Sequence, residues 1–307
     1  MRKRKIFRLH LPTRTLTLGK HTLLMGVLNV TPDSFSDGGK FLTSDRAVEQ
    51  ALSLQRAGAD ILDIGAESTR PGSQSIPMVD ELLRLLPVLQ ALRSKLKIPI
   101  SIDTRKAGVA EIAIGAGAEI INDVSGLNYD PRIAEVAARR RIPLILMHMR
   151  GEPSTMQTAP FARNVMRDVT QGLRASIQKA RRAGVAKSQI IIDPGFGFGK
   201  SFQQNYEILQ RLPELAKLGY PLMVGTSRKG FLGRTLALAK GSALGKAKTV
   251  PAEERIWATA ATVTASILGG AHIVRVHDVT EMAQVARVAD CLLDLPANAP
   301  ALPRAKK

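Results

Sequence analysis

Residues 23–30 read LLMGVLNV, an almost wholly apolar run that leads directly into the polar segment TPDSFSDGG at residues 31–39. The apolar part has the length and composition of a strand buried on both faces. The polar part carries more functional groups than a connection needs, since a turn requires little beyond Gly, Pro and one Asn or Asp. Loops that follow strands hold the chemistry of α/β enzymes. This stretch therefore predicts a buried strand with a functional loop at its carboxyl end.

Seven further apolar runs follow the first, each succeeded by a helical pattern with apolar residues three and four apart. The eight predicted strands are residues 23–30, 60–67, 99–104, 119–125, 143–149, 190–196, 221–227 and 271–277. Alternating strands and helices indicate parallel pairing, and eight such units close into an α/β fold of the (β/α)8 type, the TIM barrel. An open doubly wound sheet is the alternative arrangement of the same elements.

Segments outside the repeat set the domain organisation. Residues 6–18 alternate apolar and polar side chains, which predicts a short β-hairpin at the bottom of the barrel, within a basic N-terminal extension of residues 1–22. Residues 234–252 are basic and rich in Gly and Ala, which predicts a long loop in the seventh crossover. Residues 296–307 form a basic C-terminal tail. A single catalytic barrel is thus expected at residues 23–295.

The formal net charge is +18, with seven cations and no acid in residues 1–20. Aromatic residues are only 4% of the chain and do not interleave with the basic ends, so this charge is interpreted as incidental or solubility-related and no nucleic-acid partner is expected. The acid-free start lacks the serine that organelle transit peptides favour. The single cysteine, Cys291, excludes an intramolecular disulfide. No apolar run approaches the roughly 18 residues of a membrane span, and no secretory signal is apparent, so a cytoplasmic location is expected.

Polar side chains collect at the carboxyl ends of all eight predicted strands. They are Asn29, Asp63 and Glu67, Asp103 to Arg105, Asn122 and Asp123, His148, Asp193, Ser227 to Lys229, and Arg275 with His277 and Asp278. One or two such residues would be explained as caps or buried pairs. A set contributed by every unit instead predicts an active site at this end of the barrel.

This set contains two kinds of binding group. The cationic members are Arg70, Arg275 and His277. Guanidinium and imidazole groups suit a phosphate or pyrophosphate, and Arg275 and His277 face the same way because they lie two residues apart on one strand. The mixed members are Asp103, Asn122, Asp193 and Lys229. They suit the edge of a flat heterocycle, since a carboxylate accepts two parallel N–H bonds.

Three familiar motifs fail on inspection. Residues 195–201 read GFGFGKS, but Pro194 stands where a phosphate loop needs glycine, and Lys200 takes the third glycine position of GxGxxG. The five histidines form no HxH or HExxH pair, which argues against a transition-metal hydrolase. Lys229 lies beside Arg228 in SRKG and is interpreted as a hydrogen-bonding lysine rather than a Schiff-base former.

Several segments together resemble those of dihydropteroate synthase, a pterin-binding barrel family. They are GVLNVTPDSFSDGG, DIGAESTRPGS, IDT, INDVSG, MHM, DPGFGFGK, TSRKG and RVHDV, in order between about Leu24 and Met282. The first two are specific in combination. The resemblance implies a transferase of folate biosynthesis that condenses 6-hydroxymethyl-7,8-dihydropterin pyrophosphate with 4-aminobenzoate, giving 7,8-dihydropteroate and pyrophosphate.

The resemblance also implies roles for individual residues. The pterin contacts would be Asp103, Asn122, Asp193 and Lys229. The pyrophosphate contacts would be Asn29, Arg70, Arg275 and His277. The 4-aminobenzoate pocket would comprise Phe35, Thr69, Pro71, Phe198, Lys229 and Gly230, with Ser68 in the same loop as Thr69. The residues expected to take part in catalysis are Asp33, Phe35, Thr69, Arg70 and Lys229. Gly230 stands where some relatives have a hydroxyl, so only its backbone N–H would be available.

The same resemblance implies a cofactor, an inhibitor class and an assembly. Asn29 would bind a Mg²⁺ ion that also holds the leaving pyrophosphate. Sulfonamides would compete with 4-aminobenzoate, and the last helices would form a homodimer. We hypothesise that pyrophosphate departs before the amine attacks, with Asp33 stabilising the pterin cation. Two alternatives stay open from the sequence: a pterin-dependent methyltransferase on a related barrel, and a non-catalytic pterin-binding paralogue.

Overall fold

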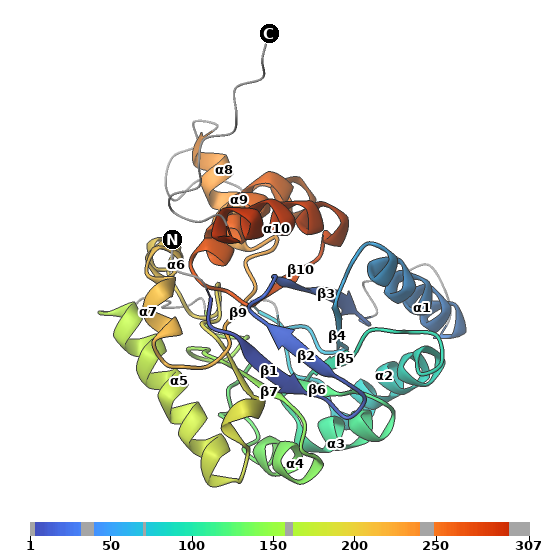
Figure 1. The fold of residues 1–307 in the computed structure, drawn as a ribbon. Helices are drawn as coiled ribbons and strands as arrows, with labels where there is room; N and C mark the ends of the chain where they lie inside the picture. Colours follow the sequence, from blue (N-terminus) through green and yellow to red (C-terminus); the bar gives the residue numbers. More distant parts are fainter. Residues whose placement is uncertain (1–3, 32–39, 70–71, 157–161, 240–248, 295–307) are drawn as a thin grey trace, which may run out of the picture.

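The computed structural model describes residues 4–31, 40–69, 72–156, 162–239 and 249–294. Its centre is a barrel of eight parallel strands surrounded by helices (Figure 1). The strands are β3 Leu23–Asn29, β4 Ile61–Gly65, β5 Ile100–Asp103, β6 Ile120–Asp123, β7 Leu144–Met147, β8 Ile190–Asp193, β9 Met223–Val224 and β10 Ile273–Val276. The hydrogen-bonded order runs β8-β7-β6-β5-β4-β3-β10-β9, and a parallel bridge from Ile192 to Leu222 joins its two ends. The predicted (β/α)8 barrel is confirmed, and the open doubly wound sheet is excluded.

Helices fill the crossovers between the strands and cover the outside of the barrel. They are α1 Lys40–Arg56, α2 Met78–Leu92, α3 Ala107–Gly115, α4 Ile133–Arg140, α5 Val165–Arg182, α6 Phe202–Gln210, α7 Leu212–Ala216, α8 Gly230–Ala239, α9 Ile256–Leu268 and α10 Val279–Asp294, with short 3-10 turns η2 Lys187–Gln189 and η3 Ala252–Arg255. Their apolar faces and the outward side chains of the strands form the larger hydrophobic core. All eight strands lie where the sequence predicts them but end earlier, which leaves many of the expected polar residues in loops.

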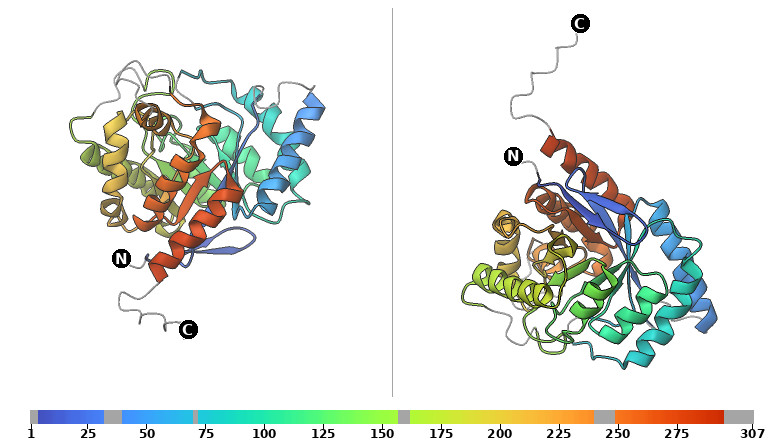
Figure 2. Two further views of the ribbon diagram at one scale, coloured as in Figure 1. Left: turned by 90° about the horizontal axis from the view of Figure 1, so that it is seen from above. Right: turned by 60° about the horizontal axis from the view of Figure 1, so that its bottom comes forward.

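A two-stranded hairpin closes the barrel at the end opposite the carboxyl ends of the strands. Its strands, β1 Phe7–His10 and β2 Thr15–Leu18, pair antiparallel, as predicted for residues 6–18. Leu9, Leu11 and Leu18 pack against the lowest layer of the barrel interior. That layer consists of Leu23, Met25, Ile61, Ile120, Ile145, Ile191, Met223 and Ile273. Figure 2 (left) shows the hairpin along the lower edge of the molecule. The hairpin therefore seals the interior from below, and ligands must enter from the other end.

One cation of the N-terminal extension is structural, which corrects our interpretation of its charge as incidental. The Arg4 side chain is only 3% exposed. It donates hydrogen bonds to Asp290 Oδ1 at 2.5 Å, to Thr22 Oγ1 at 2.7 Å and to the carbonyl of Ala271 at 2.8 Å. Arg4 thus ties the start of the chain to its last helix, α10.

The prediction of one long loop over residues 234–252 is wrong at both ends. Residues up to 239 continue helix α8, and η3 begins at Ala252; residues 240–248 lie outside the described part of the chain. Phe231, Leu232 and Ala237 are buried and hold α8 on the barrel despite its glycines. Gly233 has a packing role, because a Cβ there would lie 2.5 Å from Arg255 Nε. Tertiary packing has overridden the low helix propensity of glycine.

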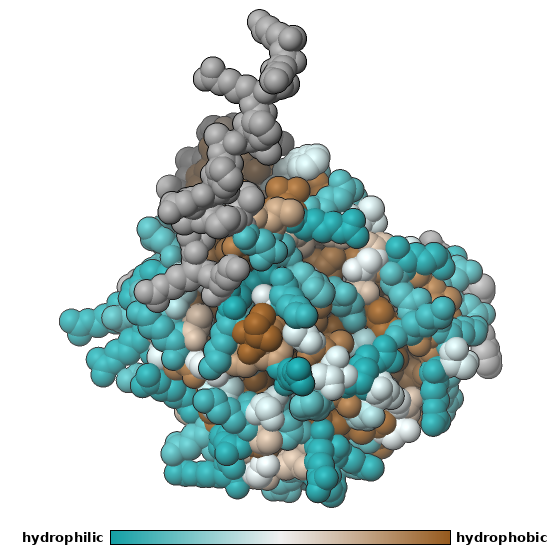
Figure 3. Space-filling model, in the orientation of Figure 1, coloured by the Kyte–Doolittle hydropathy of each residue, from teal (hydrophilic) through white to brown (hydrophobic). Residues whose placement is uncertain are grey.

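One face of the molecule, the hairpin side, mixes polar and small apolar areas (Figure 3). On the face seen in Figure 3, which is the hairpin side, hydrophilic side chains predominate and apolar residues lie in small groups between them. No helix in the part of the chain that the structure describes is long and apolar enough to cross a membrane.

Candidate active site

On four of the strands, the barrel interior changes from apolar to polar within two residues. Side chains of a strand alternate between its two faces, so residues two apart share the interior. Isoleucines of the lowest layer are followed two residues later by functional groups: Ile61 by Asp63, Ile120 by Asn122, Ile191 by Asp193 and Ile273 by Arg275. On β5 the corresponding pair is Ser101 and Asp103. The period of the strands therefore brings these groups together in one layer at the open end.

Arg275 lies at the centre of this polar layer. Its Nε donates to Asp63 Oδ2 at 2.6 Å and its Nη2 donates to Asp103 Oδ2 at 3.0 Å. Asn122 Nδ2 donates to the same Asp63 oxygen at 3.0 Å. The second oxygen of Asp63 is buried and has no hydrogen-bond partner among the described residues. Asp103 was predicted to bind the pterin and Arg275 to bind pyrophosphate. The structure joins both residues in one ion-pair network, which the sequence did not predict.

Burial weakens the charged state of the carboxylates in this layer. It raises the pKa of Asp193 to about 6, even though the Gly195 N–H donates to Asp193 Oδ1 at 2.7 Å and Lys229 lies nearby. It also raises the pKa of Asp103, against the attraction of Arg275 and with the repulsion of Asp63. A carboxylate held near its titration point in a closed barrel is typical of a binding or catalytic site.

Lys229 and Phe198, two residues predicted for the 4-aminobenzoate pocket, lie side by side. The ammonium of Lys229 sits over the Phe198 ring, 4.1 Å from its centroid. Burial lowers the pKa of Lys229 to about 8, with Arg275 adding to the effect and Asp193 opposing it. Gly230 follows at the N-terminus of α8 and is exposed, and a Cβ added to it would meet no heavy atom within 4 Å. Lys229 and Gly230 are therefore placed for an anion at this helix end.

The glycine-rich GFGFGK segment is a packing device, which agrees with its rejection as a phosphate loop. Gly195 and Gly199 both have positive φ, and a Cβ on either would lie about 2 Å from the carbonyl oxygen of His148 or Arg150. The buried Lys200 Nζ donates to the carbonyls of His148 and Phe198 at 3.1 and 2.9 Å. These contacts fix Phe198 beside Lys229.

His277 faces the cations from the end of β10. Ser227 Oγ lies 3.0 Å from its Nδ1 and accepts a hydrogen bond from its backbone N–H at 3.2 Å. Burial lowers the pKa of His277 to about 3, and Arg275, Arg228 and Lys229 add to the effect. The ring is therefore neutral near pH 7.

The structure describes some of the remaining predicted site residues, at the ends of β3 and β4, and does not describe the others. Asn29 ends β3 and is half-buried, and its side chain makes no hydrogen bond to another described residue. Ser68 is exposed and Thr69 is half-buried, both just beyond β4. The predicted site residues Asp33, Phe35, Arg70 and Pro71 lie outside the described residues.

Comparison with known proteins places these residues in a family. The model of the family described as pterin binding enzyme matches residues 25–277, which span the whole polar layer. The chain belongs to this family. The resemblance inferred from its motifs is thereby confirmed.

Similar proteins narrow the assignment to one member of the family. A dihydropteroate synthase from Synechocystis sp. is 48% identical over 274 residues, which cover 89% of this chain and 91% of that relative. A solved dihydropteroate synthase from Xanthomonas albilineans with 4-aminobenzoic acid is 39% identical, has a TM-score of 0.84, and covers 95% of this chain and 100% of its own. A Yersinia pestis dihydropteroate synthase in a sulfonamide drug complex is 38% identical, with a TM-score of 0.85 and coverage of 94% and 100%. The chain is accordingly an enzyme of the dihydropteroate synthase type.

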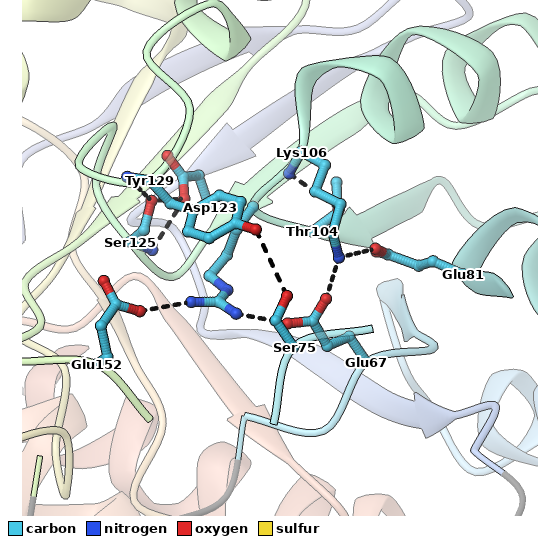
Figure 4. Close-up of polar contacts among 10 residues, drawn as sticks. Glu67, Ser75, Glu81, Thr104, Lys106, Asp123, Ser125, Tyr129 and Glu152 are labelled. Atoms are coloured by element: carbon cyan, nitrogen blue, oxygen red, sulfur yellow. Dashed lines mark hydrogen bonds and ion pairs between the residues drawn. The ribbon is translucent and has the colours of Figure 1, made fainter. Parts of the chain in front are cut away.

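A buried ion cluster that the sequence did not predict lies behind the loop that carries Thr69. Glu67 accepts a hydrogen bond from Arg105 Nη2 at 2.5 Å and another from Lys106 Nζ (Figure 4). Lys106 also donates to the fully buried Glu81 at 2.6 Å, and Arg105 Nη1 donates to Glu152 at 2.9 Å. Burial alone would raise the pKa of Glu67, but Lys106 and Arg105 hold it below its ordinary value. The cluster therefore anchors the start of this loop to the barrel.

Arg105 also connects this loop to a second one. The segment after β7 contributes Glu152, and the carbonyl of the adjacent Pro153 accepts a hydrogen bond from Gly72 N–H at 2.9 Å. The Arg105 guanidinium lies over the Tyr129 ring, 4.5 Å from its centroid. Two active-site loops far apart in sequence are thus cross-linked through one side chain. Only the partners' positions in space disclose this role, because nothing in the IDTRK sequence indicates which carboxylates Arg105 meets.

Replacing Arg105 should disturb the 4-aminobenzoate side of the site selectively. Arg105→Gln leaves Glu67 and Glu152 without their arginine partner, and breaking a buried pair such as Arg105–Glu67 costs about 3–5 kcal/mol of unfolding free energy. We expect a several-fold higher KM for 4-aminobenzoate with an unchanged dissociation constant for the pterin. Arg132→Gln is the control, because Arg132 is 73% exposed and pairs only with its neighbour Asp130. Equal losses for both substrates would contradict a role in loop positioning.

Proposed function

We propose that the open end of the barrel is one active site that joins a dihydropterin to 4-aminobenzoate. In this reaction 6-hydroxymethyl-7,8-dihydropterin pyrophosphate and 4-aminobenzoate give 7,8-dihydropteroate and pyrophosphate. The observation that carries the proposal is the polar layer itself, in which Asp103, Asn122 and Asp193 lie beside Arg275 at the end of an otherwise apolar interior. An uncharged heterocycle and an anion are the two ligand parts that such a layer would bind.

The carboxylates and the amide supply the pterin contacts. The pterin ring presents an amino group and ring N–H groups along one edge, and the buried Asp193 carboxylate has one oxygen left after accepting from Gly195. Asn122 offers a further acceptor through its Oδ1, which is buried and unpaired among the described residues. Unpaired buried groups of this kind gain most from a ligand that satisfies them.

The cationic side chains act on the leaving group. Arg275 and the neutral His277 would donate hydrogen bonds to pyrophosphate oxygens, where negative charge increases as the C–O bond breaks. Lys229 and the N-terminus of α8 would hold the 4-aminobenzoate carboxylate, with the Phe198 ring beside it. This arrangement aims the aniline nitrogen at the pterin methylene, so proximity and preorganised charge replace a strong base. Pyrophosphate departure ahead of amine attack remains our hypothesis for the order of steps.

Binding of free 6-hydroxymethyl-7,8-dihydropterin should weaken as the pH falls below about 6. Because burial raises the pKa of Asp193 to about 6, its acid form replaces the accepting carboxylate below that value. The association constant should then fall by up to about tenfold per pH unit. Calorimetric titration between pH 5 and 8 measures this, and omitting the pyrophosphate removes the titration of that group. In Asp193→Asn the pH dependence of the weak remaining binding should be reduced to the part that comes from Asp103, whose pKa burial also raises. An unchanged slope in that variant would exclude Asp193 as the titrating group.

A Mg²⁺ site at Asn29 is proposed on the chemistry of the available donors. Asn29 offers an amide oxygen at the open end of β3 with no hydrogen bond to another described residue. No group of three or more His, Cys, Asp or Glu that could hold a metal ion occurs within the described ranges. A single protein oxygen suits Mg²⁺, which keeps several waters and takes further ligands from phosphates. When bound there, the ion would supply positive charge to the departing pyrophosphate.

The Mg²⁺ proposal predicts a specific defect in Asn29→Ala. Calorimetry of inorganic pyrophosphate at increasing Mg²⁺ should show wild-type affinity rising with the ion, and the variant should need about tenfold more Mg²⁺ for the same rise, consistent with the loss of one bond to a charged group. Affinity measured with a chelator present should be the same in both proteins. Identical Mg²⁺ dependence would remove Asn29 from the site.

Assembly and location are proposed from the surface of the last helices and from the pathway. Helices α9 and α10 pack against each other and expose large apolar side chains: Trp257, which is 79% exposed, Val288 and Leu292. We propose that these helices form a homodimer, which sedimentation velocity would detect as twice the mass of the chain. A cytoplasmic location is proposed with the enzyme's place in folate biosynthesis.

Turnover distinguishes the proposal from its alternatives. Pyrophosphate release by the purified enzyme should require both the pterin substrate and 4-aminobenzoate for multiple turnovers, and sulfonamides should inhibit it competitively with 4-aminobenzoate. A pterin-dependent methyltransferase would release no pyrophosphate. A non-catalytic paralogue would bind the pterin without turnover.

A further inference from the structure

We propose that Ser227 is a positioning residue that holds His277 in a single tautomer, neutral and with the proton on Nε2. The ring then offers one hydrogen-bond donor, and the proposal rests on the function above in taking pyrophosphate as the group that receives it. Ser227 belongs to the predicted polar set but has been given no individual role, and it is only 4% exposed.

The hydrogen bonds of the Ser227 hydroxyl decide the tautomer. Its oxygen accepts the backbone N–H of His277 at 3.2 Å and lies 3.0 Å from Nδ1 of the same residue. If Nδ1 carried the proton, the hydroxyl would accept twice, and its own hydrogen would have no acceptor among the described residues. An unsatisfied buried donor costs about 1–3 kcal/mol. With Nδ1 unprotonated, the hydroxyl donates to it and every group is satisfied, so the ring proton must lie on Nε2.

A second cross-link holds the two loops in register beside this pair. The next residue of each loop forms an ion pair: Arg228 donates to both carboxylate oxygens of Asp278, at 3.0 and 2.5 Å. Arg228 has φ of +57°, in the left-handed region that a non-glycine residue rarely adopts. Its backbone is fixed on both sides, since its N–H donates to Thr259 Oγ1 at 3.1 Å and its carbonyl accepts from Arg255 at 2.6 Å. Ser227 is therefore presented to His277 by a rigid backbone.

Nε2 of His277 is the ring nitrogen that is available to pyrophosphate. Nε2 makes no hydrogen bond to another described residue, whereas Nδ1 is occupied by Ser227. A protonated Nε2 attracts a pyrophosphate oxygen, but in the other tautomer its lone pair would face that oxygen and repel it. Burial and the surrounding cations lower the pKa of His277 to about 3. The ring therefore stays neutral, and no imidazolium forms that could transfer a proton to pyrophosphate.

Nitrogen-15 NMR of the ligand-free enzyme at pH 7 tests the tautomer directly. Histidine-labelled protein gives separate signals for protonated and unprotonated ring nitrogens, and a His277→Gln variant assigns the signals of His277. His272 is an internal reference, because the Leu222 N–H donates to its Nδ1 at 3.2 Å and its Nε2 lies 3.0 Å from the Lys5 carbonyl. We expect both rings to show the Nε2-protonated pattern. An Nδ1-protonated or doubly protonated His277 would overturn the proposal.

Variants of Ser227 test the positioning role separately from turnover. Ser227→Ala should give a mixture of tautomers at His277 with no change at His272, and should bind inorganic pyrophosphate about fivefold more weakly. Ser227→Thr keeps the hydroxyl and should restore both readouts. Ser266→Ala removes another buried hydroxyl, on α9, and should change neither. An unaltered His277 spectrum in Ser227→Ala would refute the role of Ser227 even if the enzyme turns over. The expected spectra in an enzyme without turnover would instead count against the proposed function alone.

Discussion

Asp193→Asn should lower the affinity for 6-hydroxymethyl-7,8-dihydropterin by roughly 10⁴-fold, because a site built to accept N–H groups then presents a donor to them. The amide oxygen of asparagine can still accept the hydrogen bond from Gly195 that Asp193 accepts at 2.7 Å. The loop that positions Phe198 should therefore be preserved. Calorimetric titration of the free pterin measures the effect without involving 4-aminobenzoate or pyrophosphate.

The same variant should not be less stable, which separates binding from folding. Burial raises the pKa of Asp193 from 3.8 to about 6, so the stability that the protonated group contributes is complete below pH 3.8 and is lost as the pH rises through 6. At pH 7.5 this loss amounts to about 3 kcal/mol, from the difference of roughly two pKa units. Asparagine avoids it, so thermal unfolding of Asp193→Asn should occur at an equal or higher temperature than in the wild type.

Asp60→Asn is the matched control for this experiment. Asp60 is a half-buried carboxylate at the hairpin end of the barrel, and it accepts a hydrogen bond from the Leu24 N–H at 2.8 Å. The identical chemical change there should leave pterin affinity within experimental error of the wild type. A pterin affinity in Asp193→Asn that also stays at the wild-type level would remove Asp193 from the pterin site.

Arg275→Met should reduce both pterin and pyrophosphate binding and should destabilise the fold. Its guanidinium is the cation of two buried or half-buried carboxylates, Asp63 and Asp103. Removing one partner of a buried ion pair costs about 3–5 kcal/mol. The sequence alone suggested a much larger loss of pyrophosphate binding than of pterin binding, since Arg275 then had no known link to the pterin contacts. The structure revises this expectation, because Asp103 depends on Arg275 for its position and charge.

A double substitution separates the two roles of Arg275. Asp63→Asn combined with Arg275→Met removes the carboxylate that would otherwise be left fully buried without a cation. Unfolding should then occur closer to the wild-type temperature, whereas pyrophosphate affinity should stay as low as in Arg275→Met alone. Recovery of pyrophosphate binding in the double variant would show that Arg275 serves the fold only and does not contact the anion.

The strand period explains why much of the site could be predicted from the sequence. A buried strand fixes which side chains share the interior, so Asn122, Asp193 and Arg275 could be assigned to one layer once their strands were found. The sequence could not predict which side chains of that layer form hydrogen bonds and ion pairs with each other. Asp63 and Arg275 are 212 residues apart, and their contact depends on the closure of the barrel between β4 and β10 through β3.

Contacts of residues outside the strands were harder to predict, because they too depend on how distant segments meet in the folded chain. Glu67, Arg105 and Lys106 join the loops after β4 and β5, and Arg105 reaches the loop after β7 through Glu152; local sequence carries no signal for these contacts. Helix α8 extends over a stretch that composition assigned to a loop, because Phe231 and Leu232 are buried against the barrel. Arg4 resembled a surface cation until its partner on α10 was known.

The most direct measurement is the formation of 7,8-dihydropteroate by the purified wild-type enzyme, followed by chromatography with mass detection. With 6-hydroxymethyl-7,8-dihydropterin pyrophosphate and 4-aminobenzoate both present, we expect product and pyrophosphate in equal amounts over many turnovers, and none from Asp193→Asn at the same substrate concentrations. A wild-type enzyme that makes no dihydropteroate, or an Asp193→Asn enzyme that makes it at the wild-type rate, would contradict an active site built on the polar layer of this barrel.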